Sequence, residues 1–133
     1  MIFLDTSAIY ALSDRSDPNH SSAMDRFDVL LDAADETFLT HNYVLLESFA
    51  LIQHRLGVSA ALKLAKSSSR FEIVWVDRKL HDEACRRLSR SPRRRVSLVD
   101  HVSFLVMKSR GIETAFAFDR DFEEEGFRLL GEA

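Results

Sequence analysis

The sequence predicts an α/β fold: a single domain in which a mostly parallel sheet is flanked by helices. Short apolar runs alternate with stretches in which apolar residues recur at helical spacing, and this alternation is typical of a parallel sheet with crossover helices. Hydrophobic residues make up 46% of the chain and charged residues 29%, which is enough apolar material for a packed core. With 133 residues, we expect one domain that spans residues 1–133.

Five short apolar runs are the predicted strands. They cover residues 1–4, 37–40, 71–76, 114–118 and 127–130. The third run, FEIVWV, is the clearest, because β-branched and aromatic residues favour strands. Trp75 lies inside this run and is predicted to be part of the core.

The spacing of apolar residues predicts helices between the first and second strands and between the second and third. After Pro18, one helix face carries Ala23, Met24, Phe27, Leu30, Leu31 and Ala34. A second helix begins near Asn42, and Gly57 is placed to stop it. Ser59 is placed to cap a short helix that follows.

Two further helices separate the third and fourth strands. Asp77 opens the first of them, and the arginine-rich loop SRSPRRR follows it. Ser97 is placed to cap a long helix that has Asp100 in its first turn and ends at Gly111.

Composition limits the cellular setting. The chain has a single cysteine, Cys85, so no internal disulfide can form. The apolar N-terminus lacks a basic segment and is interrupted by Asp5, unlike a signal peptide. No run approaches the roughly 18 apolar residues of a membrane span. We therefore expect a cytoplasmic protein without a membrane partner. The net charge of −3 does not by itself predict nucleic-acid binding.

Four acidic residues are predicted to meet at one edge of the sheet. Asp5 ends the first strand and Asp119 ends the fourth. Glu47 lies in the early turns of the helix after the second strand, and Asp100 lies at the start of the helix that leads into the fourth. Because ligands of open parallel sheets bind at the carboxyl ends of the strands, we expect these four side chains to share a site.

Carboxylates in such a cluster predict a metal site. Like charges at close range raise each other's pKa and oppose folding unless a cation lies between them. Oxygen ligands without histidine or cysteine select Mg²⁺ or Mn²⁺ over Zn²⁺. Mg²⁺ usually keeps several waters and completes its shell with substrate phosphate, an arrangement that suits phosphodiester hydrolysis.

Each acid also has a structural explanation when it is taken alone. Asp100 can be a helix-start carboxylate that the helix dipole favours, and Asp119 can cap the turn DRDF. Glu47 lies within a strongly apolar helix, and Asp5 directly follows MIFL, where an unpaired carboxylate is costly. The four positions together favour a common site over chance placement.

Four segments carry a resemblance that covers essentially the whole chain. In order they are MIFLDTSAIYAL, THNYVLLESFALI, SLVDHVSFLVMKSRGIETAFAFDRDF and GFRLL. None is decisive alone, but all four in this order resemble the PIN-domain ribonucleases of the VapC type, the toxin half of bacterial toxin–antitoxin pairs. The resemblance implies one PIN-like nuclease domain over residues 1–133, with a five-stranded parallel sheet.

By that resemblance, the protein is a metal-dependent endoribonuclease that hydrolyses RNA. The implied ligands of Mg²⁺ or Mn²⁺ are Asp5, Glu47, Asp100 and Asp119. Thr6 or Ser7 would hydrogen-bond within the site as support. Asp121 is either a fifth acid of the site or a turn residue.

The resemblance also implies partners. These are an RNA substrate, a second copy in a homodimer, and a small VapB-type antitoxin whose tail covers the site. The chain departs from the family pattern at one place, because many members carry Thr or Ser just before the last aspartate. Here Ala117 and Phe118 stand there, which bears on the hydrogen-bonded support of the site but leaves the acids intact.

A cluster of arginines lies just before the helix that bears Asp100. Its members are Arg86, Arg87, Arg90, Arg93, Arg94 and Arg95. Such a cluster is typical either of a solvated helix face or of a phosphate-binding surface. Because the loop leads to the predicted site, we expect Arg93, Arg94 and Arg95 to contact the RNA backbone. His41 and His101 adjoin the site segments and are predicted to be bystanders.

Other functions fit less well. Phosphatases of the haloacid dehalogenase class need a second aspartate two residues after the first, where this chain has Ser7. A phosphoacceptor signalling domain needs a late strand that ends in lysine, whereas the fourth strand here ends in Asp119. A PIN-like module that only binds nucleic acid would be expected to lose one or more acids. A nuclease acting on DNA remains an alternative, because metal-dependent hydrolysis suits both phosphodiesters.

Overall fold

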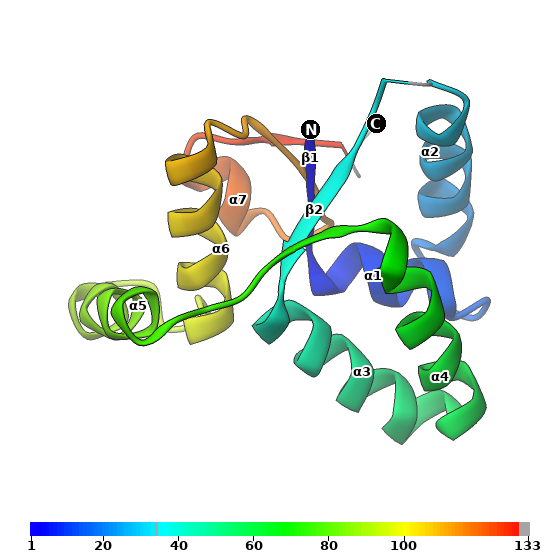
Figure 1. Cartoon of the computed structure of the whole chain (residues 1–133), viewed down its shortest axis with the longest axis horizontal. Coiled ribbons are helices and arrows are strands. Elements are labelled where there is room, and N and C mark those ends of the chain that lie inside the picture. Colours follow the sequence, from blue (N-terminus) through cyan, green and yellow to red (C-terminus); the bar gives the residue numbers. More distant parts are fainter. Residues whose placement is uncertain (34, 131–133) are drawn as a thin grey trace.

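The computed structural model describes residues 1–33 and 35–130, which form one five-stranded parallel sheet with helices around it (Figure 1). The strands are β1 (Ile2–Leu4), β2 (Phe38–His41), β3 (Glu72–Val74), β4 (Thr114–Phe116) and β5 (Arg128–Leu129). Their order is β3-β2-β1-β4-β5, and every neighbouring pair is parallel. The predicted fold class and all five predicted strands are thereby confirmed. Four strands are shorter than their apolar runs, and β2 has the predicted length but begins and ends one residue later.

Helices fill every connection between the strands. They are α1 (Thr6–Ser13), α2 (His20–Asp32), α3 (Asn42–Leu56), α4 (Val58–Ser67), the short 3₁₀ helix η1 (Ser68–Arg70), α5 (Arg78–Arg90), α6 (Leu98–Arg110) and α7 (Asp121–Glu124). α1 packs against α2 and α3, α3 packs against α4, and α5 packs against α6. Figure 1 shows α5, α6 and α7 on the left of β1 and β2, with α2 and α4 on the right. Ala34, which was predicted to extend the apolar face of the second helix, lies outside the described residues.

The strand order creates a switch point between β1 and β4. The chain adds β2 and β3 on one side of β1, then crosses over to add β4 and β5 on the other. β1 and β4 are paired through Phe3 opposite Ala115 and Leu4 opposite Phe116. Crevices at the carboxyl ends of strands form where the order reverses in this way. The end of β1 therefore lies at the place where a ligand site is expected.

Aromatic side chains fill the core between the sheet and α6. Phe3, Phe104 and Phe122 are fully buried. The ring of Phe104 meets the ring of Phe122 edge to face at 5.1 Å between centroids, and Phe122 lies 6.1 Å from Phe3. Phe122 is the second residue of α7. Aromatic packing thus holds the short α7 against β1 and α6.

Two α-helices were not predicted from the sequence. α1 begins directly after Asp5, and α7 follows β4 by a few residues. Most of α1 is buried, so its residues form one apolar run without the polar face that marks a helix. Such a run cannot be assigned to helix or strand by periodicity. α7 has only four residues, which is too short for any period to show.

Two local predictions were wrong. Ser59 does not cap α4, because that helix already begins at Val58, and Gly57 with φ of 96° separates it from α3. Trp75 is not in the core: β3 ends at Val74 and Trp75 is 72% exposed. The chain leaves the sheet there because the backbone N–H of Val76 is donated to the side chain of Asn42 rather than to a strand.

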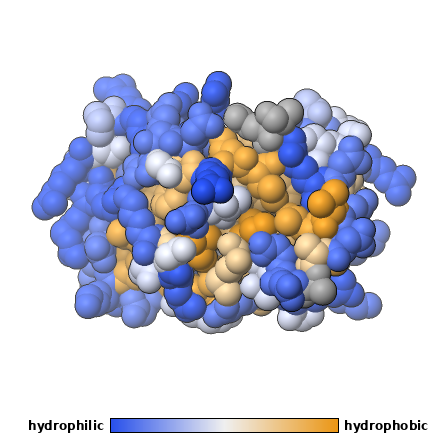
Figure 2. All heavy atoms as spheres, turned by 90° about the horizontal axis from the view of Figure 1, so that it is seen from above, coloured by the Kyte–Doolittle hydropathy of each residue, from blue (hydrophilic) through white to orange (hydrophobic). Residues whose placement is uncertain are grey.

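Polar and apolar surfaces are separated on the molecule. Seen from above, hydrophilic residues cover the end where α5 lies, whereas apolar residues gather near the middle of the face, toward α2 (Figure 2). Within residues 1–33 and 35–130, no helix combines the length and the apolar character that crossing a membrane requires.

Candidate active site

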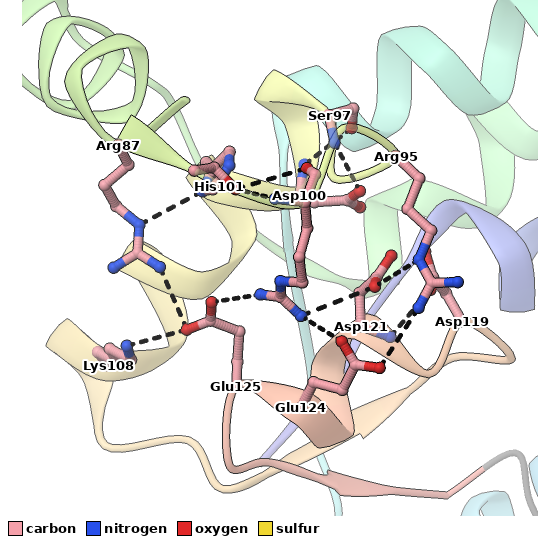
Figure 3. Close-up of polar contacts among 12 residues, drawn as sticks. Arg87, Arg95, Ser97, Asp100, His101, Lys108, Asp119, Asp121, Glu124 and Glu125 are labelled. Carbon is pink, nitrogen blue, oxygen red and sulfur yellow. Dashed lines mark hydrogen bonds and ion pairs between the residues drawn. The ribbon is translucent and has the colours of Figure 1, made fainter. Parts of the chain in front are cut away.

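Three aspartates form a compact cluster at the switch point. Asp100, Asp119 and Asp121 each offer a carboxylate oxygen, and these atoms lie within 4.8 Å of one another. Asp100 comes from the first turn of α6, Asp121 is the first residue of α7, and Asp119 lies in the turn before it. Figure 3 shows the three side chains converging from these elements. Asp121 therefore belongs to the cluster and is not merely a turn residue.

Asp5 stands at the end of β1 and is held by Ser7. The carboxylate is 4% exposed, and it accepts hydrogen bonds from the backbone N–H of Ser7 at 3.1 Å and from the Ser7 hydroxyl at 2.6 Å. The same hydroxyl oxygen accepts the backbone N–H of Phe118 at 3.0 Å. Ser7 thus joins the ends of β1 and β4. It places a hydroxyl beside residues 117–118, where the expected Thr or Ser of the family is absent.

Burial and crowding make Asp5 hard to ionise. Burial is the largest cause that raises the pKa of Asp5 to about 7. The charges of Asp100 and Asp119 act in the same direction, and the hydrogen bonds from Ser7 act against them. Asp5 is therefore electrostatically coupled to two members of the cluster.

Asp100 is held by a capping box and has a raised pKa as well. Its carboxylate accepts the backbone N–H of Ser97 at 3.0 Å, and its own N–H is donated to the Ser97 hydroxyl at 3.2 Å. Burial is the main cause that raises the pKa of Asp100 to about 6, with smaller contributions from the charges of Asp119 and Glu47. The predicted cap at Ser97 is confirmed, and the same capping box holds the Asp100 carboxylate in place.

Asp119 follows the same pattern. Burial is the largest cause of its raised pKa, and the neighbouring Asp121 adds to it. The backbone N–H of Asp121 is donated to the Asp119 carboxylate at 3.0 Å and opposes that rise. Each of the three acids with a raised pKa thus accepts a backbone N–H from a residue two or three positions away.

Glu47 and Thr6 complete the surroundings. Glu47 is exposed on α3 and lies outside the compact trio, but its charge acts on Asp100. Thr6 follows Asp5, and its buried hydroxyl oxygen has no hydrogen-bond partner among the described residues. A buried hydroxyl without a partner is unfavourable, so Thr6 leaves an unused donor and acceptor next to Asp5.

The donor set fits a hard divalent cation. All of its ligand atoms are oxygens. Burial, together with repulsion from neighbouring acids, raises the pKa of Asp5 and Asp100, and a cation among the carboxylates would favour their charged forms. Water or a cation would also satisfy the Thr6 hydroxyl. Mg²⁺ and Mn²⁺ both match this chemistry.

The two histidines near the site, His41 and His101, are buried. The Nδ1 atom of His41 accepts the backbone N–H of Val44 at 3.3 Å, and Nε2 is bonded to the Ser103 hydroxyl at 2.8 Å. Burial lowers the pKa of His41 to about 3, so the ring is neutral and caps α3. His101 is buried on α6, and burial also lowers its pKa.

The arginines predicted to contact RNA differ in their surroundings. Arg93 donates to Glu124 and to Glu125, each at 2.7 Å. Arg95 donates from Nε to Asp121 at 3.1 Å and from Nη2 to Glu124 at 3.3 Å (Figure 3). Arg94 is exposed, and no ion pair joins it to any residue that the structure describes.

Sequence reasoning missed these pairs between arginines and the acids of α7. The available signal was the acidic run DFEEE, which follows the arginine-rich loop by about two dozen positions. Two of the three arginines thus already carry counter-charges, so Arg93 and Arg95 neutralise α7 in this structure. Their contact with RNA stays a prediction.

Replacing Asp5 by asparagine should stabilise the metal-free protein at high pH. Its pKa in the folded state, about 7, exceeds the ordinary value of 3.8, so the folded protein retains a proton that the unfolded chain has released. Stability should therefore fall as pH rises between these two values. At about pH 8, Asp5→Asn should raise the free energy of unfolding by roughly 2–4 kcal/mol, with much less change near pH 4.

Urea unfolding in excess chelator measures this effect. The matched control is Asp25→Asn, which changes an exposed carboxylate on α2 and should alter stability little at either pH. A loss of stability for Asp5→Asn at pH 8 would contradict the assignment of Asp5 as a buried, repelled carboxylate.

Known proteins share both the sequence and the fold. The family model of the PIN domain matches residues 2–127. The 23S rRNA-specific endonuclease VapC20 of Mycobacterium tuberculosis is 36% identical over 129 residues, which cover 96% of this chain and 95% of the relative, in strain CDC 1551 and in strain H37Rv alike.

Solved structures agree with this match. The crystal structure of Mycobacterium tuberculosis VapC20, described as a toxin that cleaves the sarcin–ricin loop, superposes with a TM-score of 0.84 at 35% identity and 96% coverage of both chains. PAE2754 from Pyrobaculum aerophilum superposes with a TM-score of 0.64 at 22% identity, covering 97% of this chain and 88% of that one, and it supports the fold alone. Three findings agree: the parallel sheet has acids at its switch point, the family model spans nearly the whole chain, and a relative is 36% identical. The chain therefore belongs to the PIN-domain family, as a VapC-type member.

Proposed function

We propose that this protein is a metal-dependent endoribonuclease that acts as the toxin of a toxin–antitoxin pair, with residues 1–133 as its nuclease domain. The observation that carries the proposal is the convergence of Asp100, Asp119 and Asp121 within 4.8 Å, next to the buried Asp5. Such a cluster is unstable without a cation, and a hard cation beside a phosphodiester is a hydrolytic site. The family membership and the relative's printed activity support the same function.

The proposed ligands of Mg²⁺ or Mn²⁺ are Asp5, Glu47, Asp100 and Asp119, with Asp121 beside them. When bound, such an ion polarises the phosphate and favours deprotonation of the attacking water. The chain's own residues supply the geometry. Ser7 holds Asp5 through two hydrogen bonds, and Ser97 holds Asp100. Thr6, which directly follows Asp5, has a buried hydroxyl without a hydrogen-bond partner among the described residues, and we propose it as support for the site.

RNA is favoured over DNA by the relatives. The curated relative is named for an activity on 23S rRNA, whereas the acidic cluster would serve either nucleic acid. A module that only binds nucleic acid is disfavoured, because all four predicted acids are present and three of them have raised pKa values. Such values are costly to maintain unless a cation or a reaction uses them.

The first prediction from this function is that cleavage requires both a metal and Asp100. Total bacterial RNA should yield discrete fragments with Mg²⁺ or Mn²⁺, and none with excess chelator. Since losing even an outer partner of a metal ligand costs about 10–100-fold, Asp100→Asn should reduce the rate by about 100-fold or more. Gel analysis of the fragments measures this.

The control for that experiment is again Asp25→Asn, which makes the same chemical change on α2. It should cleave at the wild-type rate. Metal-dependent cleavage by well-folded Asp100→Asn at the wild-type rate would rule out this carboxylate as part of the site. No cleavage by the wild-type protein under any condition would favour a binding role instead.

We infer that the substrate is 23S rRNA, cut at the sarcin–ricin loop. This rests on VapC20, whose printed descriptions give that target and whose chain is matched along 95% of its length. Incubation with intact bacterial ribosomes should give one cut in 23S rRNA, mapped to this loop by primer extension. Cuts confined to transfer RNA or messenger RNA would overturn this inference while leaving the nuclease function intact.

A VapB-type antitoxin and a cytoplasmic location belong to the same proposal. A ribosome-directed nuclease must be restrained in the compartment where ribosomes work. An antitoxin tail that reaches the acidic cluster would be expected to offer cations there, because the cluster has an unmet negative charge.

We infer further that the protein forms a homodimer through an exposed apolar surface on α3 and α4. Leu46 is 71% exposed and Trp75 is 72% exposed, and both line one groove with Leu45 and Phe49. Large apolar side chains grouped on a surface typically mark an interface. A second copy is the occupant that the family resemblance implies.

Light scattering coupled to size-exclusion chromatography tests the dimer. The wild-type protein should elute as a dimer, and Trp75→Glu should shift it to a monomer by placing a charge in the interface. Val29→Glu introduces the same charge at an exposed apolar position on α2 and should leave the dimer unchanged. A monomeric wild type, or a Trp75→Glu dimer of unchanged stability, would exclude this surface.

A further inference from the structure

A basic pocket lies between α5 and the helices that carry the acidic cluster. It has a volume of about 430 Å³. Its charged lining residues are Arg86, Arg87, Arg90, Arg93, Glu83 and Glu125. Four cations and two anions give the lining a formal charge of +2, whereas the chain as a whole carries −3. The pocket is therefore a local positive site on an acidic protein.

Two of these arginines are held in place by Glu125. Arg87 donates from Nη2 to this carboxylate at 3.1 Å, and Arg93 donates to its other oxygen at 2.7 Å. Lys108 also reaches it, at 3.3 Å (Figure 3). One carboxylate thus faces three cations. The walls of the pocket are therefore fixed. Because Arg93 also pairs with Glu124, the positive charge without an ion pair among the described residues is that of Arg86 and Arg90.

The other two arginines are available to a ligand. Arg86 and Arg90 are exposed on α5, and neither guanidinium group makes a hydrogen bond or an ion pair with the residues that the structure describes. They are four positions apart, so they lie one above the other on the same helix face. Like charges at this spacing destabilise a helix unless an anion lies between them.

His101 is a buried member of the same lining. It is 2% exposed, and its Nδ1 atom accepts a hydrogen bond from Nε of Arg87 at 3.4 Å. The ring proton of the neutral histidine is therefore on Nε2. That atom is buried and has no hydrogen-bond partner within residues 1–33 and 35–130. His101 therefore holds Arg87 within the pocket wall, and contact with a ligand is left to the exposed arginines.

The pocket also adjoins the acidic cluster. Arg93 lines it and at the same time places Nη1 at 3.7 Å from the Asp121 carboxylate. His101 directly follows Asp100 on α6. Figure 3 shows Arg87 and His101 on one side of Asp100, with Asp119 and Asp121 on the other. An anion in the pocket would therefore be a near neighbour of a phosphate at the acids.

We propose that this pocket binds a backbone phosphate of the RNA substrate adjacent to the one that is cut, with Arg86 and Arg90 as the contacting side chains. The proposal rests on the nuclease function above and differs from the sequence prediction, which assigned backbone contacts to Arg93, Arg94 and Arg95. Arg93 and Arg95 are instead used as counter-charges to α7. Phosphate contacts position a nucleic acid without reading its sequence.

The test is the salt dependence of RNA binding by Arg86→Gln/Arg90→Gln. A short fluorescent single-stranded RNA is titrated with the full chain in excess chelator, so that no cleavage occurs, at several salt concentrations. The logarithm of the binding constant falls with the logarithm of the salt concentration, and each lost phosphate contact on a single strand makes this slope less steep by about 0.7. The slope of the double variant should therefore be less steep than that of the wild type by about 1.4. Affinity should fall severalfold, to the same extent for RNAs of different sequence.

A matched control removes the same charge from the other end of the same helix. Arg78→Gln/Lys79→Gln changes two exposed cations at the start of α5, outside the pocket lining, and should keep the wild-type slope. Cleavage with metal gives a second readout. Arg86→Gln/Arg90→Gln should raise KM with little change in kcat, as expected for lost substrate binding away from the reacting phosphate.

The outcomes separate the two proposals. Wild-type affinity, slope and KM in the double variant, from a protein that cleaves RNA, would overturn the phosphate pocket and leave the nuclease function standing. Equal losses in the pocket variant and in the control would show general charge attraction and would also overturn the pocket. A wild-type protein that neither binds nor cleaves RNA would overturn both.

Discussion

Negative charge that is crowded at the switch point is the constraint on which this structure depends. Asp5 and Asp100 are buried where the parallel sheet reverses its order, and burial raises the pKa of each well above its ordinary value. The fold tolerates this because short-range donors hold the carboxylates: Ser7 bonds Asp5, and Ser97 bonds Asp100. Those donors orient the acids without supplying positive charge. The cluster is consequently preorganised for a cation, which fits a family of metal-dependent enzymes.

Positive charge reaches the site from the loop before α6. Arg93 and Arg95 come from the loop before α6 and pair with the acidic face of α7. Without them, Asp121 and the glutamates of α7 would add to the repulsion within the cluster. Phe122 anchors the same helix in the aromatic core. Packing and ion pairs together thus determine where α7 carries Asp121.

The sequence was sufficient to predict what depends on short-range patterns. The end of β1 directly before Asp5 follows from an apolar run that stops at an acid, and Ser97 follows from its capping-box spacing with Asp100. The run before Asp119 indicated the fourth strand, but β4 ends at Phe116, three residues before that acid. The placement of Asp121 in the compact trio did not follow, because it depends on α7, a helix too short to leave a pattern. Pairing of Arg93 with Glu124 and Glu125 depends on contacts between segments about 30 positions apart, which no local pattern records. The exposure of Trp75 depends on where β3 leaves the sheet, and its side chain alone suggested burial.

The pairing of β1 with β4 has a consequence for synthesis of the chain. Phe3 and Ala115 are neighbours in the sheet, and the Ser7 hydroxyl reaches the backbone of Phe118. These contacts cannot form until residues 115–118 have been synthesised, and such long-range pairing makes folding slow. A nascent chain that has exposed β1 to α4 still lacks Asp100, Asp119 and Asp121. The acidic cluster is consequently assembled only after α6, β4 and α7 have all emerged from the ribosome that makes the chain.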